Sequence, residues 1–64
     1  MIFYQAYYQE QGQERPTFLS LQISQQDAIA DLTTLGYTTS KLHTSVGGVL
    51  FDTIQSIGVA IVHI

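Results

Sequence analysis

One helix in the middle of the chain, with a signal at each end, constrains the fold most. Ser24 stands where an N-cap belongs, and Asp27 follows three residues later, as in a capping box with a shorter acid. Gly36 ends the segment at the C′ position, where glycine takes a positive φ at little cost. The residues between these signals place one apolar stripe along the helix, made of Ala28, Ile29, Leu32 and Leu35. The sequence therefore predicts one amphipathic helix between Ser24 and Gly36.

The segment before this helix has the pattern of a β-hairpin. Residues 2–9 and 17–23 are rich in aromatic and β-branched residues that alternate with polar ones, while residues 10–16 are polar and contain Gly12 and Pro16. Alternation predicts two faces for each strand. One face carries Ile2, Tyr4, Ala6 and Tyr8 with Leu19, Leu21 and Ile23, and the other carries Phe3, Gln5, Tyr7 and Gln9 with Phe18, Ser20 and Gln22.

The segment from residue 37 to residue 57 has two interpretations. Gly47-Gly48 lies between two alternating runs, which is typical of a hairpin with a type I′ turn. The competing interpretation is a second helix at residues 46–57, because five apolar residues of that segment share a helical stripe. Two glycines would cost such a helix about 2 kcal/mol, and its β-branched content favours a strand. We therefore prefer the hairpin, which also allows Asp52 to cap one short turn that ends at Ile57.

The chain ends in a strand, residues 59–64, that is apolar on both faces. Such a strand is usually central in its sheet or buried at an interface. The complete pattern is ββαββ(β), an α+β fold in which one helix covers one face of a mostly antiparallel sheet. The alternative, with the second helix, is ββαβαβ. Residues 1–64 form a single small domain in either case.

The composition limits how such a small chain can be stabilised and what it can bind. Of its 64 residues, none is cysteine, and only 11% are charged, which is well below the roughly 25% of an average protein. Chains of this size without disulfides usually need a metal or a partner subunit. The net charge is −3, with two cations in total, so we expect no direct binding of nucleic acid and no binding to an anionic membrane.

The ends and hydropathy of the sequence give no targeting signal. It contains no stretch of about 18 apolar residues that would span a bilayer. The first residues also lack the basic segment and long apolar core of a signal peptide. We therefore expect a cytoplasmic protein.

Candidate chemical sites are few, and each has a simpler structural explanation. Asp27 and Asp31 share a helix face but lack further oxygen ligands for a divalent cation, so helix-end electrostatics explain them better. The segment from Thr44 to Gly48 lacks the lysine and the spacing of a phosphate-binding loop, and a hairpin turn explains it better. Ser40, Ser45 and Asp52 stand in no motif of a catalytic nucleophile. We expect no enzyme activity, no metal and no cofactor.

A surface of uncharged aromatic and glutamine side chains is the strongest candidate site. If Leu19, Leu21 and Ile23 face the helix, the opposite face of the hairpin is left uncovered. The predicted interface residues on that face are Phe3, Gln5, Tyr7, Gln9, Phe18 and Gln22. Exposed aromatic residues among uncharged polar groups are typical of protein interfaces.

Three classes of function follow from these observations. The first is a non-enzymatic protein–protein interaction module, a dimeric adaptor or inhibitor that docks on a larger protein; phage- or plasmid-borne inhibitors of host defence, of the anti-CRISPR or anti-restriction class, have a similar size and acidity. The second is a metal- or ligand-dependent activity built at a subunit interface from Tyr37, His43, Asp52 and His63. The third is nucleic-acid binding, with Tyr7 and Phe18 as stacking platforms.

Overall fold

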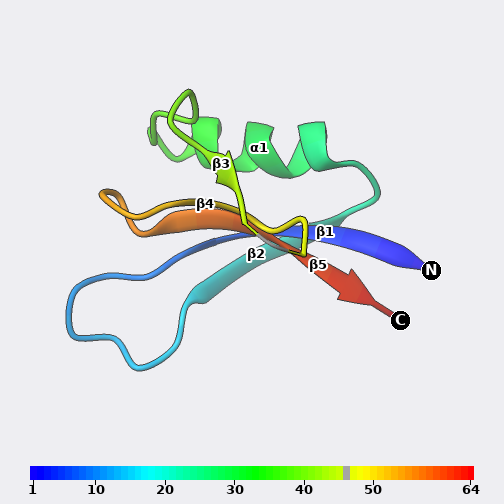
Figure 1. Ribbon diagram of the computed structural model, residues 1–64, viewed down its shortest axis with the longest axis horizontal. Helices are drawn as coiled ribbons and strands as arrows, with labels where there is room; N and C mark the ends of the chain where they lie inside the picture. Colours follow the sequence, from blue (N-terminus) through cyan, green and yellow to red (C-terminus); the bar gives the residue numbers. More distant parts are fainter. Residues whose placement is uncertain (46) are drawn as a thin grey trace.

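The computed structural model describes residues 1–45 and 47–64 as a five-stranded antiparallel sheet with one helix (Figure 1). The strands are β1 (Ile2–Tyr8), β2 (Thr17–Gln22), β3 (His43–Thr44), β4 (Leu50–Asp52) and β5 (Ile57–His63), and the helix is α1 (Gln25–Thr34). The strand order across the sheet is β2-β1-β5-β4-β3. The α+β fold with an N-terminal hairpin and a single helix is as predicted, with three strands after the helix.

Both ends of α1 are held by the residues that predict them. The Ser24 side chain accepts a hydrogen bond from the Asp27 backbone N–H at 3.2 Å. At the other end, Gly36 has a φ of +94°. Gly36 N–H donates to the Thr33 carbonyl, and Tyr37 N–H donates to the Leu32 carbonyl. These two bonds form a Schellman motif, which satisfies carbonyl groups that the last turn leaves without a helical partner.

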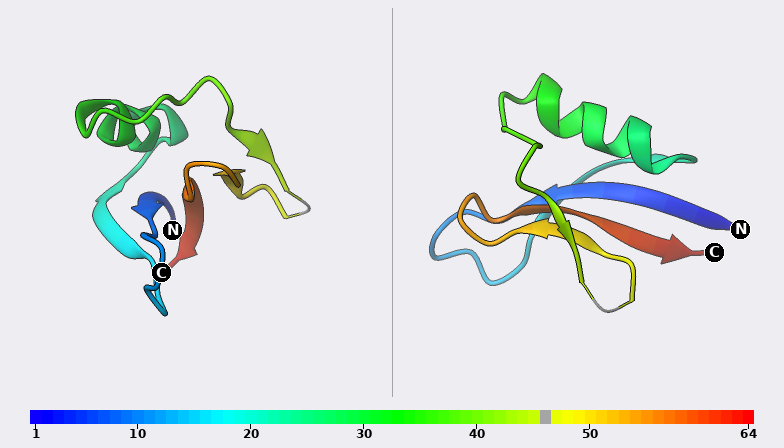
Figure 2. Two further views of the ribbon diagram at one scale, coloured as in Figure 1. Left: turned by 90° about the vertical axis from the view of Figure 1, so that its left-hand side faces the viewer. Right: turned by 45° about the horizontal axis from the view of Figure 1, so that its top comes forward.

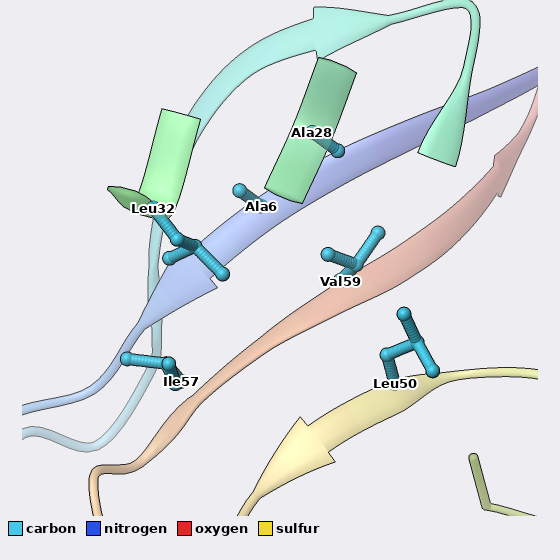
Figure 3. Close-up of a cluster of buried hydrophobic side chains, with 6 residues drawn as sticks. All are labelled: Ala6, Ala28, Leu32, Leu50, Ile57 and Val59. Atoms are coloured by element: carbon cyan, nitrogen blue, oxygen red, sulfur yellow. The ribbon is translucent and has the colours of Figure 1, made fainter. Parts of the chain in front are cut away.

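The core lies between α1 and one face of the sheet. Six apolar residues are buried there: Ala6, Ala28, Leu32, Leu50, Ile57 and Val59 (Figure 3). Figure 2 shows the strands in an arc beneath α1, so that the helix packs on the concave side. Of the strands described, β1, β2 and β5 contact α1. The opposite face of the sheet carries no helix, and we refer to it below as the open face.

A β-bulge in β2 changes the faces predicted for the hairpin. Between the pairs Gln5↔Leu21 and Tyr7↔Phe18 there is one residue on β1, Ala6, but there are two on β2. The extra residue reverses the alternation of β2 after Ser20. Leu21 therefore shares the open face with Gln5, and Gln22 shares the helix side with Tyr4.

Three predicted orientations are corrected by this bulge. Leu21 is 42% exposed instead of facing the helix, and Ile23 is 74% exposed. Gln22, predicted on the open face, points to the helix and donates a hydrogen bond from Nε2 to Asp31 Oδ2 at 3.0 Å. Leu19 does pack against the core, as expected. The hydrophobic stripe of α1 is also shorter than predicted, because Leu35 is the C-cap and is half-exposed.

The region after the helix contains the hairpin of β3 and β4, and the alternative helix at 46–57 is wrong. Residues 50–52 form β4, and Gly47 and Gly48 have φ angles of +103° and +83°, which no right-handed helix accepts. Ser45 N–H donates to the Val49 carbonyl at 2.8 Å. The pairing of β3 with β4 is therefore centred on Gly47, whereas the predicted two-residue turn would be centred between Gly47 and Gly48. Val46 lies outside the described residues.

The last two strands are joined by a turn that Asp52 caps. Its Oδ1 atom accepts hydrogen bonds from the backbone N–H groups of Ile54 and Gln55 at 2.9 and 3.3 Å. The short turn predicted between Asp52 and Ile57 is thus confirmed. The strand that follows, β5, is central as expected, because it pairs with β1 on one side and β4 on the other.

Replacing Ser56 with glycine is expected to stabilise the protein. Ser56 closes this turn with a φ of +56°, and it is the non-glycine residue with a positive φ among those described. The left-handed region costs a residue with a Cβ atom about 1–2 kcal/mol, and the extra freedom of glycine in the unfolded chain returns about 0.5–1 kcal/mol of this. Chemical denaturation should show a gain of about 0.5–1 kcal/mol. Thr53→Gly, in the same turn but without a positive φ, should lose stability, and equal effects of the two changes would contradict this explanation.

Candidate functional site

The open face is defined by the register of all five strands. Residues that pair across antiparallel strands lie on the same face, and the pairs that include Gln5 and Tyr7 lie opposite to the buried Ala6. The face then extends through the pairs of β5 with β4 and of β4 with β3. Its residues are Phe3, Gln5, Tyr7, Phe18, Leu21, His43, Phe51, Gly58, Ala60 and Val62.

One row of aromatic residues crosses the open face from edge to edge. The pairs His43↔Phe51, Phe51↔Gly58, Gly58↔Tyr7 and Tyr7↔Phe18 connect all five strands. His43 and Phe51 meet edge to face with ring centroids 5.1 Å apart, and Tyr7 and Phe18 do so at 6.1 Å. Such contacts hold the rings in defined positions. The row is therefore an ordered aromatic strip.

Gly58 makes room for the Tyr7 ring in the middle of this row. A Cβ atom at Gly58 would collide with Tyr7 Oη and Cζ and with the Leu50 carbonyl oxygen. The ring therefore lies across the backbone of β5, where a side chain would otherwise stand. Burial raises the pKa of the Tyr7 hydroxyl above its usual value of 10.0, because the phenolate form would lose solvation.

The apolar surface continues from this row toward the two chain termini. Phe3 pairs with Val62, and Gln5 pairs with Ala60. Beyond them, Met1 and Ile64 exchange backbone hydrogen bonds, and their side chains are 82% and 73% exposed. The open face thus presents aromatic and aliphatic side chains along the whole length of β1 and β5, with Gln5 as a polar group between them.

Charged side chains lie outside the strand positions of the open face. Glu10, Glu14 and Arg15 lie in the loop between β1 and β2, Asp27 and Asp31 lie on α1, and Lys41 precedes β3. Asp52 points to the helix side, as its pairing with the buried Ile57 requires. Among the described residues, no charged side chain occupies a strand position on the open face. A partner can therefore cover these strand positions without desolvating a carboxylate, a lysine or an arginine.

Two shallow concavities lie where β1 ends and β5 begins. The larger, of about 620 Å³, lies between the loop after β1 and the turn before β5, and its polar lining includes Gln13 and Gln55. Both of these amides already bond within the chain, Gln13 to Thr17 and Gln55 to Thr38. The smaller, of about 260 Å³, lies between Tyr7 and Phe51 beside the aromatic row. The second concavity offers the open face a depression for an apolar side chain.

The structure brings four of the six predicted interface residues together on the open face. These are Phe3, Gln5, Tyr7 and Phe18. Gln9 follows β1, and its side chain donates to the Gln13 carbonyl at 2.8 Å, whereas Gln22 lies on the helix side. The face also contains residues that the sequence pattern missed. Leu21 was missed because of the bulge in β2, and the others were missed because their strands could not be placed: His43, Phe51, Gly58, Ala60 and Val62. Gly58 had one available signal, since a glycine inside a strand often marks a close approach of another group.

The residues considered for metal binding are not gathered in one place. His43 lies on the open face, in register with Gly58, whereas His63 lies five residues further along β5 on the helix side. Five residues of strand span about 17 Å. Asp31 is engaged by Gln22, and Tyr37 packs on Tyr8 with ring centroids 6.0 Å apart. Among residues 1–45 and 47–64, no group of three or more histidine and acidic side chains is arranged to hold a metal ion.

Comparisons of the chain with protein-family models, with curated proteins and with solved structures found no match. Among the helices described, none is long and apolar enough to cross a membrane. The open face itself is therefore the basis for a functional assignment.

Proposed function

We propose that the protein is a non-enzymatic protein–protein interaction module that docks on a larger protein through its open face. The observation that carries this proposal is the ordered aromatic row from His43 to Phe18, continuous with the apolar surface around Phe3 and Val62. Buried interface centres are rich in aromatic residues and poor in charges, and they are strongest where side chains are already held in place.

The exposed area of the chain supports the proposal that a partner covers part of its surface. Its accessible surface is 4395 Å², somewhat more than the roughly 4,100 Å² expected of a folded monomer of this mass. A standard interface takes about 800 Å² from each partner, which is about a fifth of this surface. Among residues 1–45 and 47–64, eight large apolar side chains are exposed, and covering even part of them would add stability that the six-residue core does not supply.

Tyr7→Ala and Phe18→Ala are expected to abolish or weaken the capture of the partner from cells that contain it. Truncating an anchor residue at an interface costs about 2 kcal/mol or more, which corresponds to about a thirtyfold rise in Kd. The captured protein is then purified, and its Kd for each variant is measured by calorimetry. Gln26→Ala, on the exposed surface of α1, is the matched control and should bind as the original chain does. Circular dichroism must show that each variant is folded. Unchanged binding by both face variants would refute the proposal.

The proposal includes a dimeric adaptor or inhibitor that acts in the cytoplasm. An inhibitor of a host defence complex fits the same surface, because such a protein needs only a shaped face. Within one chain, the separation of His43 from His63 gives the metal-dependent alternative no support. Nucleic-acid binding is not favoured either, since the open face offers stacking rings but, in the part of the chain that the structure describes, no lysine or arginine to contact phosphate.

A further inference from the structure

The free edge of the sheet at β2 has features of a self-association site. β2 is the outer strand next to β1, and the opposite edge, β3, is only two residues long. Natural edge strands are usually protected from pairing by charged residues or by proline. The six residues of β2, Thr17–Gln22, include neither, although Arg15 and Pro16 come just before the strand and a bulge at Leu19 and Ser20 interrupts it. This edge is therefore open to another strand at the positions where its backbone N–H and C=O groups point outward.

The hydrogen-bond pattern shows which backbone groups of β2 point outward. The backbone groups of Met1 and Gln9 bond to Ile64 and Ser56, on the β5 side. The backbone N–H and C=O groups of odd-numbered residues of β1 therefore point toward β5, and those of even-numbered residues point toward β2. Because Tyr4 pairs with Gln22 and Tyr8 pairs with Thr17, the backbone groups of Gln22 and Thr17 point toward β1.

The bulge determines where the backbone groups of the other four β2 residues point. Leu19 and Ser20 both lie opposite Ala6, so their backbone groups point toward β1. The Leu19 carbonyl also accepts a hydrogen bond from Gln5 Nε2 at 2.9 Å. Phe18 and Leu21 are left, and each directs its backbone N–H and C=O away from the sheet.

These outward groups are self-complementary. Phe18 and Leu21 lie at equal distances from the midpoint of β2, which falls between Leu19 and Ser20. A two-fold axis through that midpoint, perpendicular to the sheet, would bring two copies of β2 together as antiparallel strands. Phe18 of each copy then lies opposite Leu21 of the other, with N–H facing C=O in both directions. We propose that the β2 edge binds the β2 edge of a second copy of this chain in this register.

Side chains favour the same register. Phe18 and Leu21 are 50% and 42% exposed, and they lie on the open face. In the pair, each becomes a cross-strand neighbour of the other residue type and is covered by it. The β2 segment itself adds no like-charge contact.

This geometry keeps both open faces on the same side of one ten-stranded sheet, with both α1 helices on the other side. The four side chains at the seam, Phe18 and Leu21 of each copy, join the two aromatic rows into one surface. This last consequence rests on the proposed docking function of the open face; the edge pairing itself does not. The dimer would thus present a partner with a doubled apolar surface.

Backbone N-methylation at Leu21 tests the edge, and a chain of this length is accessible to chemical synthesis. The modification removes an outward N–H and leaves the side chain in place. Each dimer loses two hydrogen bonds, each worth about tenfold in affinity, so the dimer dissociation constant measured by sedimentation equilibrium should rise at least about a hundredfold. N-methylation at Gln11, in the exposed loop, is the matched control and should dimerise as the unmodified chain does. Ala60→Lys places a charge in the open face, away from the edge, and should also leave the dimer intact.

Hydrogen exchange gives a second readout that does not depend on any variant. In the dimer, the amide protons of Phe18 and Leu21 are bonded, so their exchange should slow as the protein concentration rises. A monomer at all concentrations would overturn the edge pairing. So would a dimer that survives N-methylation at Leu21, or an unmodified dimer in which the Phe18 and Leu21 amides still exchange fast. A dimer broken by Ala60→Lys but not by N-methylation would also overturn it, and it would identify the open face as the dimer contact. Failure of the docking function appears separately, in the binding of Tyr7→Ala.

Discussion

Replacing Gly58 with alanine is expected to lower the free energy of unfolding by about 3 kcal/mol, because forcing a methyl group into a packed position typically costs about 1–3 kcal/mol or more. The new Cβ atom would meet a backbone oxygen, that of Leu50, as well as the Tyr7 ring. A domain of this size is stable by only about 3–10 kcal/mol. Thermal denaturation should therefore show a melting temperature lower by about 12–24 °C.

Two further variants separate the contact at Gly58 from other effects of losing a glycine. Gly12→Ala is the matched control: Gly12 has a φ of +90°, but a Cβ atom there meets nothing within 4 Å. It should lose about 1 kcal/mol through backbone strain alone. In the double variant Tyr7→Ala/Gly58→Ala, the ring is gone and only the clash with the Leu50 carbonyl remains. The double variant should lose less stability than the two single losses combined. Additive losses, or a Gly58→Ala loss no larger than that of Gly12→Ala, would show that the Tyr7 ring does not occupy this position.

Local signals in the sequence predicted the helix and both of its ends. Ser24 and Gly36 act on backbone groups only a few residues away, so their effect does not depend on the rest of the fold. The hairpin of β1 and β2 and the central position of β5 were also predictable, because alternation and two-sided hydrophobicity reflect burial directly. The turn after Asp52 belongs to the same category, since its side chain bonds to residues two and three positions ahead.

The orientation of single side chains in β2 was not predictable in the same way. A bulge depends on how two strands pair, and nothing in the residues Leu19 and Ser20 marks the extra position. Gln22 and Leu21 consequently exchange faces relative to the alternating pattern. The register of the β3–β4 hairpin differs for a related reason, because the Gly-Gly pair permits more than one turn and the pairing of Ser45 with Val49 selects among them.

The candidate site depends both on local sequence signals and on how the strands pair. Phe3, Gln5, Tyr7 and Phe18 were expected to lie together because they belong to one hairpin of known alternation. The remaining part of the open face comes from β3, β4 and β5, whose positions depend on the strand order. Gly58 illustrates the limit: its role becomes apparent only when β5 lies beside β1 and the Tyr7 ring lies across it.

Replacing Asp52 with alanine is expected to cost about 3 kcal/mol, because a hydrogen bond to a charged group contributes about 1.5–3 kcal/mol and two backbone N–H groups, those of Ile54 and Gln55, lose their acceptor. Asp52 is 2% exposed. Besides the two backbone bonds that cap the turn, its Oδ2 atom accepts a hydrogen bond from Gln55 Nε2 at 3.3 Å. The same amide donates to the Thr38 carbonyl at 3.2 Å, so Asp52 also orders the contact between this turn and the chain after α1. Urea denaturation measures the loss.

Two related variants show which of these bonds matters. Asp52→Asn keeps an acceptor for the backbone N–H groups of Ile54 and Gln55 but removes the one that faces Gln55 Nε2, so it should lose about half as much as alanine. Gln55→Ala keeps the cap and removes the link to Thr38, and it should lose about 1 kcal/mol. Because the capped turn ends where β5 begins, Asp52→Ala should also speed hydrogen exchange at Gly58, and through it loosen the position of Tyr7 on the open face. A loss below about 0.5 kcal/mol for Asp52→Ala would mean that water replaces the carboxylate, and the turn would then owe its shape to the pairing of β4 with β5 alone.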